Sequence, residues 1–316
     1  MRDATISLFS LVAALGIGAA DASVEGRHGP ALDLPPGAFV QVGDHRLHLY
    51  CEGTGSPTVV FDSGLGSSSL DWARVQPDVA RLTRACVYDR AGYGWSDPGP
   101  APRDSATIVR ELAELLGHGG VAPPYVLVGH SFGGFNVRLF ASEHPDETAA
   151  LVLIDSSHEK QFERFDEAGL ESTAPEPGGG EIIIGNPAVV PSSLPADLQD
   201  LARSFTLRAG FIATLRSELR NLRVSAGEVQ AAAPLPDVPL VVISHRVTAD
   251  GVSVRKGKLW LDMQQELATR TSRAQLVMAD TPDHYVQLSE PEVVVAAIRT
   301  VLAESRPAPA ATSTLQ

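Results

Sequence analysis

The feature that most constrains this chain is the sequence Gly-His-Ser-Phe-Gly at residues 129–133, which directly follows the apolar run Tyr-Val-Leu-Val at residues 125–128. An amphipathic segment follows at residues 135–142, so Ser131 stands between an expected buried strand and an expected helix. A strand-to-helix turn this tight strains the serine backbone and accepts only small flanking residues. The pattern predicts a nucleophile that projects from the sheet edge, whereas a glycine-rich turn with a solvated serine is the alternative.

Two further segments supply expected partners of Ser131. Residues 58–61 form an apolar run that ends in a glycine-rich sequence at residues 62–66. Such a loop, next to the nucleophile turn, supplies a backbone N–H for an oxyanion, and the residue after the nucleophile supplies another. We therefore expect Leu65 and Phe132 to provide the two oxyanion N–H groups.

A histidine stands where a general base is expected. Residues 276–278 form an apolar run, His284 lies in the loop that follows, and a helix is expected at residues 291–302. A histidine after the last strand can reach a serine at the same edge of the sheet, and the chain order serine, acid, histidine agrees with this arrangement. We therefore expect His284 to be the base.

Two aspartates are candidates for the acid of this triad. Asp155 ends the apolar run at residues 151–154, whereas residues 244–249 separate Asp250 from the apolar run at residues 240–243. A rigid strand end orients an imidazole better than a loop does, so we favour Asp155 over Asp250. Capping of local backbone N–H groups is the alternative role of Asp155.

Together these residues resemble the α/β-hydrolase fold family, in the form of a single-domain bacterial serine hydrolase with a small helical cap. The resemblance covers residues 47–158 and 239–299. It includes the sequence Tyr-Asp-Arg-Ala-Gly-Tyr-Gly-Trp-Ser-Asp at residues 88–97, which is similar to the loop after the fourth strand in that family. It implies an α/β fold with a mostly parallel eight-stranded sheet flanked by helices, and with a helical cap inserted after the sixth strand.

The chain departs from the family pattern in one loop. The usual His-Gly before the oxyanion residue is replaced by Ser63 and Gly64, so a side chain that often braces the loop is missing. The backbone N–H groups of an oxyanion hole do not require that side chain.

The resemblance also bears on the acid and on the chemistry. One haloalkane-dehalogenase subgroup of the superfamily takes its acid from the end of the strand after the nucleophile turn, and Asp155 matches that position. Those enzymes use a carboxylate nucleophile, whereas this chain has Ser131, so dehalogenation and epoxide opening are disfavoured.

The expected activity is hydrolysis of a small-molecule carboxylic ester through an acyl-enzyme, with no cofactor and no metal. Amide or C–C bond hydrolysis on the same triad is an alternative, and a non-catalytic binding protein is another.

The composition agrees with one catalytic domain and limits its partners. A chain of 316 residues can bury a large core. A formal net charge of −13, without a run of lysine or arginine, argues against binding to nucleic acid or to anionic membranes. We expect a small acyl substrate as the partner.

The two ends of the chain differ in composition from the rest. Residues 6–20 are apolar, and Ala-Asp-Ala at residues 20–22 offers a cleavage site. We interpret residues 1–22 as a secretory signal and the protein as exported, without stable membrane insertion after cleavage; an uncleaved anchor is the alternative. The remaining expected parts are a linker at residues 23–37, the hydrolase domain at residues 38–305 and a disordered tail at residues 306–316.

The chain has two cysteines, Cys51 and Cys86, in the expected second and fourth strands. These strands are neighbours in the family that the chain resembles, and export favours oxidation. We therefore expect one disulfide between them, and two unrelated buried thiols are the alternative.

The one long stretch without a strand pattern is residues 157–236. Apolar residues with helical spacing occur in its second half, at Leu198, Leu201, Phe205, Leu207, Phe211, Leu215 and Leu219. We interpret the stretch as the cap and expect this apolar stripe to pack on the sheet domain rather than on lipid.

Three further histidines lie near these motifs. His130 precedes the nucleophile, and we expect it to point away from Ser131 and to pack in the core. His158 and His245 lie in loops near the mouth of the site, and we expect both to be solvated.

Overall fold

The computed structural model describes residues 35–170, 190–248 and 251–305, without the side chains of residues 251–253. The chain divides into two units, Met1–Pro35 and Pro36–Gln316, and the second contains all the elements given below. The expected signal segment, most of the expected linker, the expected tail and Asp250 lie outside the described residues.

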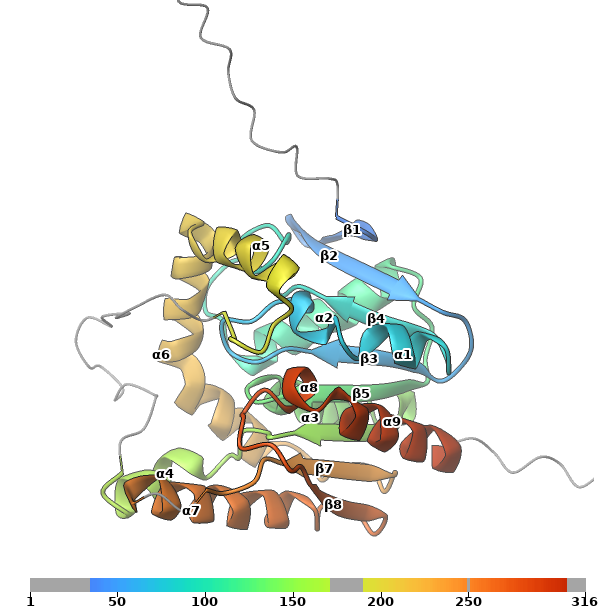
Figure 1. Ribbon diagram of the computed structural model, residues 1–316. Helices are drawn as coiled ribbons and strands as arrows, with labels where there is room; N and C mark the ends of the chain where they lie inside the picture. Colours follow the sequence, from blue (N-terminus) through green and yellow to red (C-terminus); the bar gives the residue numbers. More distant parts are fainter. Residues whose placement is uncertain (1–34, 171–189, 249–250, 306–316) are drawn as a thin grey trace, which may run out of the picture. The chain divides into compact units, whose positions relative to one another are not determined.

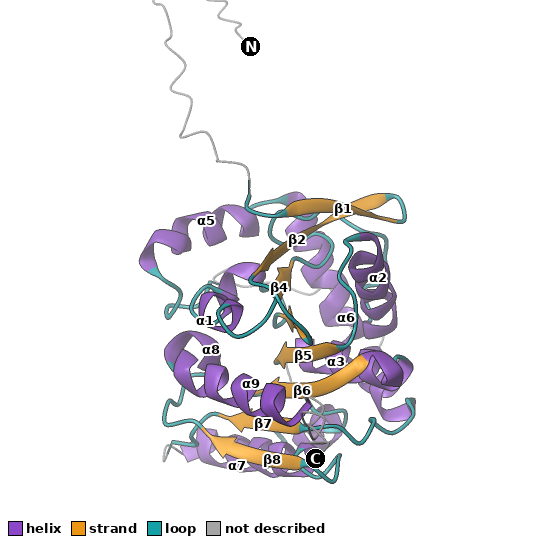
Figure 2. Ribbon diagram, turned by 90° about the vertical axis from the view of Figure 1, so that its right-hand side faces the viewer, coloured by secondary structure: helices purple, strands orange, loops and turns teal. Residues whose placement is uncertain are grey.

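The described residues form one sheet of eight strands (Figure 2). The strands are β1 (Ala38–Val42), β2 (His45–Glu52), β3 (Thr58–Asp62), β4 (Ala85–Tyr88), β5 (Tyr125–His130), β6 (Thr148–Ile154), β7 (Leu240–Ser244) and β8 (Ala274–Met278). Their order in the sheet is β1-β2-β4-β3-β5-β6-β7-β8. Strand β2 is antiparallel to both of its neighbours, and all other pairs are parallel. The mostly parallel eight-stranded sheet expected from the resemblance is thus confirmed.

Both faces of the sheet are buried, because the central strands have apolar side chains on both sides. In β3, Val59 and Phe61 pack into one apolar layer and Val60 packs into the other. A strand that is buried on both faces has a continuous apolar sequence instead of an alternating one. This explains the uninterrupted apolar runs at residues 58–61 and 125–128.

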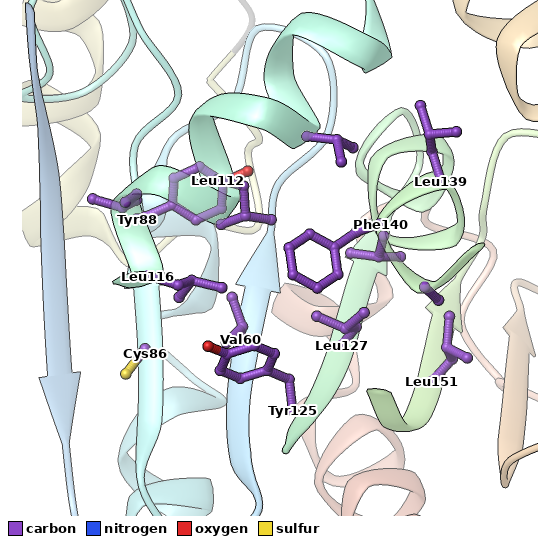
Figure 3. Close-up of a cluster of buried hydrophobic side chains, with 14 of the residues drawn as sticks. Val60, Cys86, Tyr88, Leu112, Leu116, Tyr125, Leu127, Leu139, Phe140 and Leu151 are labelled. Carbon is purple, nitrogen blue, oxygen red and sulfur yellow. The ribbon is translucent and has the colours of Figure 1, made fainter. Parts of the chain in front are cut away.

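A layer of helices covers each face of the sheet (Figure 1). One layer consists of η1 (Ser69–Trp72), α1 (Gln76–Ala80) and α9 (Pro291–Ser305), and the other includes α2 (Ser105–His118), α3 (Gly133–Glu143) and the end of α7 (Gly251–Leu267). Figure 3 shows the second layer, in which Leu112, Leu116 and Phe140 lie beside Val60 and Leu127. Two short helices, η2 (Pro145–Glu147) and α8 (Val286–Ser289), precede β6 and α9.

The insertion between β6 and β7 is helical in its described parts. It contains α4 (Gln161–Glu167), α5 (Ala196–Thr206) and α6 (Ala209–Ala231). Phe211 and Leu215 of the expected apolar stripe are buried, but Leu207 is 78% exposed because it lies between α5 and α6, where the helical spacing is interrupted. Helix α6 packs on α2 and α3, so the stripe reaches the helical layer of the sheet domain. Among the described residues, no helix has both the length and the hydrophobicity needed to cross a membrane.

A buried network of charges joins α6 to the sheet. Arg90, in the loop after β4, donates from Nη1 to Asp62 Oδ1 at 2.8 Å and from Nε to Glu218 Oε1 at 3.0 Å. Tyr93 donates its hydroxyl to Glu218 Oε2 at 2.8 Å. The three charged side chains are at most 2% exposed, so neither carboxylate has water to replace the guanidinium.

The network predicts a large effect of Glu218→Ala on stability. We expect the free energy of unfolding to fall by about 3 to 5 kcal/mol, because Arg90 loses one of its two buried partners. Urea unfolding followed by circular dichroism measures the change. Arg220→Ala, on the exposed side of the same helix, is the matched control and should stay within about 0.5 kcal/mol of the parent protein. An equally small change in Glu218→Ala would contradict the proposed dependence.

A disulfide bond joins Cys51 to Cys86. The two residues face each other in the register of β2 and β4, and they lie 35 positions apart in the chain. The bond therefore ties the antiparallel edge of the sheet to its parallel part.

In protein produced in an oxidising compartment, we expect neither cysteine to react with an alkylating reagent under denaturing, non-reducing conditions. After reduction, both should react, and intact mass counts the labels. The chain-entropy model assigns such a bond about 3 to 4 kcal/mol of stability, so the double variant Cys51→Ala, Cys86→Ala should unfold at lower urea concentration. Two labels on the unreduced protein would rule out the bond.

Candidate active site

Ser131 lies in the tight turn between β5 and α3. Its φ is +51°, in the left-handed region where a side chain strains the backbone. A Cβ on Gly133 would lie 2.3 Å from the carbonyl oxygen of Asp62, and a Cβ on Gly129 would lie 2.7 Å from the carbonyl oxygen of Gly133. The two glycines of the sequence pattern are therefore required by the close approach of the backbone.

The end of the neighbouring strand is strained in the same way. Asp155, which follows β6 directly, has a φ of +43°. Hydrogen bonds hold both positions, because the N–H of Ser131 donates to the Ile154 carbonyl at 3.1 Å and the N–H of Asp155 donates to the Ile243 carbonyl at 2.7 Å. The hydrogen bonds between strands thus continue through the two strained residues and fix the positions of their backbone atoms.

His284 links Ser131 to Asp155 by hydrogen bonds. His284 lies in the loop between β8 and α8, and its Nε2 is 2.9 Å from Ser131 Oγ. Its Nδ1 is 2.5 Å from Asp155 Oδ2. The structure therefore brings together the three residues that the sequence predicts as nucleophile, base and acid. The alternative acid, Asp250, lies outside the described residues.

Asp155 is fully buried, yet donors surround its carboxylate. Burial alone would raise its pKa, but hydrogen bonds from His245 and His284 outweigh burial and hold the pKa of Asp155 well below its usual range. Trp260 of α7 also donates, from Nε1 to Oδ1 at 2.7 Å. The carboxylate is therefore ionised at neutral pH and accepts hydrogen bonds only. Nδ1 of His284 must then hold a proton, which leaves its Nε2 as the acceptor.

The expected oxyanion residues lie beside Ser131. Leu65 and Phe132 line the same cavity as Ser131. In the described ranges, the N–H of neither residue donates to a protein acceptor, so both groups are available to a substrate oxygen. The two N–H groups are therefore candidates for an oxyanion hole.

Arg90 braces the loop that contains Leu65. Its guanidinium donates to the carbonyl oxygens of Ser63 at 2.7 Å and of Gly64 at 2.8 Å. Trp72 donates from Nε1 to Ser63 Oγ at 2.9 Å. Sequence reasoning missed this brace, because it depends on the buried pairing of Arg90 with Glu218, which lies 128 positions away.

His130 is buried beside the rings of His284 and Tyr285, in agreement with the packing role expected for it. Its Nε2 lies 3.0 Å from the backbone carbonyl oxygen of His284, and a carbonyl only accepts, so this nitrogen holds a proton. Burial lowers the pKa of His130 to about 3, which keeps the ring neutral. The bond ties the end of β5 to the loop that contains the base.

Neither of the two histidines for which we predict solvation is a freely solvated side chain. His245 follows β7, and its Nδ1 donates to Asp155 Oδ2 at 2.7 Å. His158 is fully buried and accepts a hydrogen bond on Nδ1 from the backbone N–H of Lys160 at 3.1 Å. Burial lowers the pKa of His158 to about 4, so it stays neutral. Both predictions are wrong because a position in a loop does not show which side chains the fold packs around.

His245 and Trp260 are the site residues that the sequence motifs do not identify. A signal for His245 exists in the strand order. Ile154 of β6 pairs with Ile243 of β7, so the residues that follow these two strands meet at one edge of the sheet. Trp260 comes from α7 and has no comparable signal.

A cavity of about 560 Å³ opens beside Ser131. Apart from the polar groups described above, its wall is largely apolar and includes Phe132, Phe165, Leu222 and Trp260. Arg246 and Lys256 also line it. This size and lining are typical of a site for a small molecule.

Asp155, His245 and His284 are residue types that bind transition metals, and one ligand atom of each lies within 4.8 Å of the others. The carboxylate oxygen contacts both imidazole Nδ1 atoms directly, at 2.5 and 2.7 Å. An ion between them would have to break both hydrogen bonds. We therefore interpret the cluster as a hydrogen-bonded one.

Comparisons with known proteins agree with this fold. The model of the alpha/beta hydrolase fold family matches residues 57–174. The protein YbdG of Bacillus subtilis is 29% identical over 137 residues, which is 43% of this chain and 42% of that protein. The solved enol-lactonase of Burkholderia xenovorans LB400 has a TM-score of 0.57 at 19% identity, over 84% of this chain and 100% of that chain. A Vigna radiata epoxide hydrolase mutant has a TM-score of 0.61 at 18% identity, over 84% and 98% of the two chains.

The matches are uneven in what they cover. At these identities the solved structures show a likeness of fold alone. The chain spans about half or less of the length of the first curated relatives that it matches. The family model, however, covers the segment from β3 to α4, which includes Ser131, Asp155 and the oxyanion residues. Together with the order of the strands, this match shows that the chain has the α/β-hydrolase fold.

Proposed function

We propose that this protein is a serine hydrolase that cleaves a small-molecule carboxylic ester through an acyl-enzyme intermediate. The observation on which the proposal rests is the unbroken series of hydrogen bonds from Ser131 Oγ through His284 to a buried, ionised Asp155. A serine hydroxyl is a weak nucleophile, and a base that is itself oriented by a carboxylate activates it.

Acylation follows from the position of each group. His284 Nε2 takes the proton of Ser131 as Oγ attacks the ester carbonyl carbon. The N–H groups of Leu65 and Phe132 bind the oxyanion, where one such donor contributes about 3 kcal/mol to the stability of the transition state. Asp155 keeps the proton of His284 on Nδ1 and stabilises the imidazolium. The tetrahedral intermediate then collapses, and His284 gives its proton to the leaving alcohol.

Deacylation uses the same groups in the same order. A water molecule enters in place of the alcohol, and His284 takes its proton as the oxygen attacks the acyl carbon. The second tetrahedral intermediate releases the carboxylic acid and restores the Ser131 hydroxyl with the proton from His284. These steps need only the groups named here and the substrate.

The choice of an ester rests on the nucleophile and on the cavity. A cavity of about 560 Å³ with a largely apolar wall suits a small acyl group. One structural neighbour is named as an enol-lactonase, and a lactone is a cyclic ester. Another neighbour is an epoxide hydrolase, but the serine at the nucleophile position favours acyl transfer over epoxide opening.

We also propose that the protein is exported. The apolar segment at residues 6–20 supports a secretory signal. The disulfide between Cys51 and Cys86 supports an oxidising compartment, because disulfides are rare in the reducing cytosol.

Replacing the nucleophile tests the proposal directly. We expect Ser131→Ala to lower ester turnover at least about a thousandfold, with little change in the midpoint of thermal unfolding, because the hydroxyl serves chemistry rather than packing. Turnover of p-nitrophenyl esters of increasing acyl length measures the loss and reports the depth of the cavity, and matching p-nitroanilides test amide hydrolysis. Ser142→Ala, at the end of α3, is the control. Residual activity in Ser131→Ala within tenfold of the parent would show that another group is the nucleophile.

The two candidate acids are distinguished by a pair of isosteric variants. Asp155→Asn should lower kcat by about 10⁴-fold, as the loss of a triad carboxylate does elsewhere, because the amide no longer stabilises the imidazolium. Asp250→Asn should lower kcat less than about tenfold. Steady-state kinetics on one p-nitrophenyl ester compares them. The opposite ranking would move the acid to the loop after β7.

A further inference from the structure

Asp155 binds a second imidazole besides that of His284. His245 follows β7, the strand beside β6, and its Nδ1 lies 2.7 Å from Asp155 Oδ2. The same oxygen binds Nδ1 of His284 at 2.5 Å. The backbone N–H of His245 also faces this carboxylate, with 3.4 Å between N and Oδ1. Two imidazole rings therefore share one carboxylate.

The shared carboxylate defines where the protons lie on both rings. An ionised carboxylate only accepts, so Nδ1 of each ring donates and each Nε2 is the atom that gains or loses a proton. Nε2 of His284 lies against Ser131 Oγ. The side chain of His245 is 20% exposed and lines the cavity, so protons from solvent reach its ring.

The charged groups around His245 act in opposite directions. The hydrogen bond to Asp155 raises the pKa of His245 above its ordinary value, burial lowers it, and the nearby carboxylate of Asp283 raises it. Other groups that line the cavity oppose a further positive charge there, namely His284, Arg246 and Lys256. On balance the carboxylates favour the protonated form of His245.

Two protonated rings at this site would repel each other. One ligand atom from each ring and one from Asp155 lie within 4.8 Å of one another, and a single carboxylate balances only one positive charge. When His245 holds a proton, the charge of Asp155 is already neutralised. His284 then has less stabilisation for the imidazolium that it must form when it activates Ser131.

We propose that His245 is a positioning residue whose protonation state controls how well Asp155 stabilises the imidazolium of His284. While His245 is neutral, the negative charge of Asp155 stabilises that imidazolium. When His245 is protonated, its positive charge offsets the charge of Asp155, and His284 no longer activates Ser131. The proton comes from solvent and forms only the Nε2–H bond of His245. This role of His245 rests on the proposed function, because the proposed function assigns His284 as the base. Activity is thus present at high pH and is lost as the pH falls through the titration of His245.

The pH profile of kcat/KM for a p-nitrophenyl ester tests this role. His245→Asn keeps a side-chain N–H near the position of Nδ1 but cannot take up a proton. We expect its acid limb to lie at lower pH than that of the parent by about half a unit or more, whatever the value of kcat/KM on the plateau. His118→Asn, an exposed histidine on α2, is the matched control and should leave the acid limb in place. Acid limbs that coincide in His245→Asn and the parent would overturn the proposal.

A second measurement needs no turnover. Ring-proton NMR of Ser131→Ala, with the His245 signal identified by its loss in His245→Asn, follows the proton uptake of His245 directly. We expect a midpoint above the ordinary value of a histidine, and we expect it to fall by about half a unit or more when Asp155→Asn is added. A midpoint that Asp155→Asn leaves unchanged would overturn the coupling.

The two measurements separate two kinds of failure. If the NMR midpoint responds to Asp155 but no ester is hydrolysed, the shared carboxylate stands and the proposed function fails. If esters are hydrolysed but neither the acid limb nor the NMR midpoint moves, the proposed function stands and the role of His245 fails. Circular dichroism of each variant shows that it is folded, and His245→Asn provides the kinetic test even if Asp155→Asn does not fold.

Discussion

The arrangement of the site depends on one buried carboxylate. Asp155 has no exposed surface, so its charge is stable only while hydrogen-bond donors surround it. These donors come from three other parts of the chain: the end of β7, helix α7 and the loop after β8. A shift in any of them would leave a buried charge with too few partners. The need to satisfy this one group therefore selects a single arrangement of the elements around Ser131.

A second buried charge, on the other side of the nucleophile, also holds distant segments of the chain in one arrangement. Arg90 holds the carbonyl oxygens of the oxyanion loop and, through Glu218, a helix of the cap. Helix α6 and the loop that contains Leu65 are thus parts of one network rather than separate structures. A substitution in α6 that breaks the pairing with Arg90 is therefore expected to disturb this loop without contacting a substrate.

Much of the fold and of the site could be predicted from local sequence. The strands are recognisable because a strand buried on both faces must be apolar throughout. Ser131 is recognisable because the tight turn around it requires glycine at residues 129 and 133. His284 and Asp155 follow from their places after strands, since parallel strands end at the same edge of a sheet. Leu207 shows the limit of such reasoning, because helical spacing continues in the sequence across a break between two helices.

The sequence by itself determined the strand pattern and the nucleophile turn, because each of these depends on residues that are close in the chain. The pairing of the two cysteines was predicted from the strand order of the family that the chain resembles. Only the tertiary structure decided that His245 and Trp260 bind Asp155 and that Arg90 meets Glu218. A lone histidine, tryptophan or arginine has no sequence pattern that separates a buried partner from a solvated side chain. Its role depends on which distant segment the packed core places against it, and on the cost of leaving a buried charge without a partner.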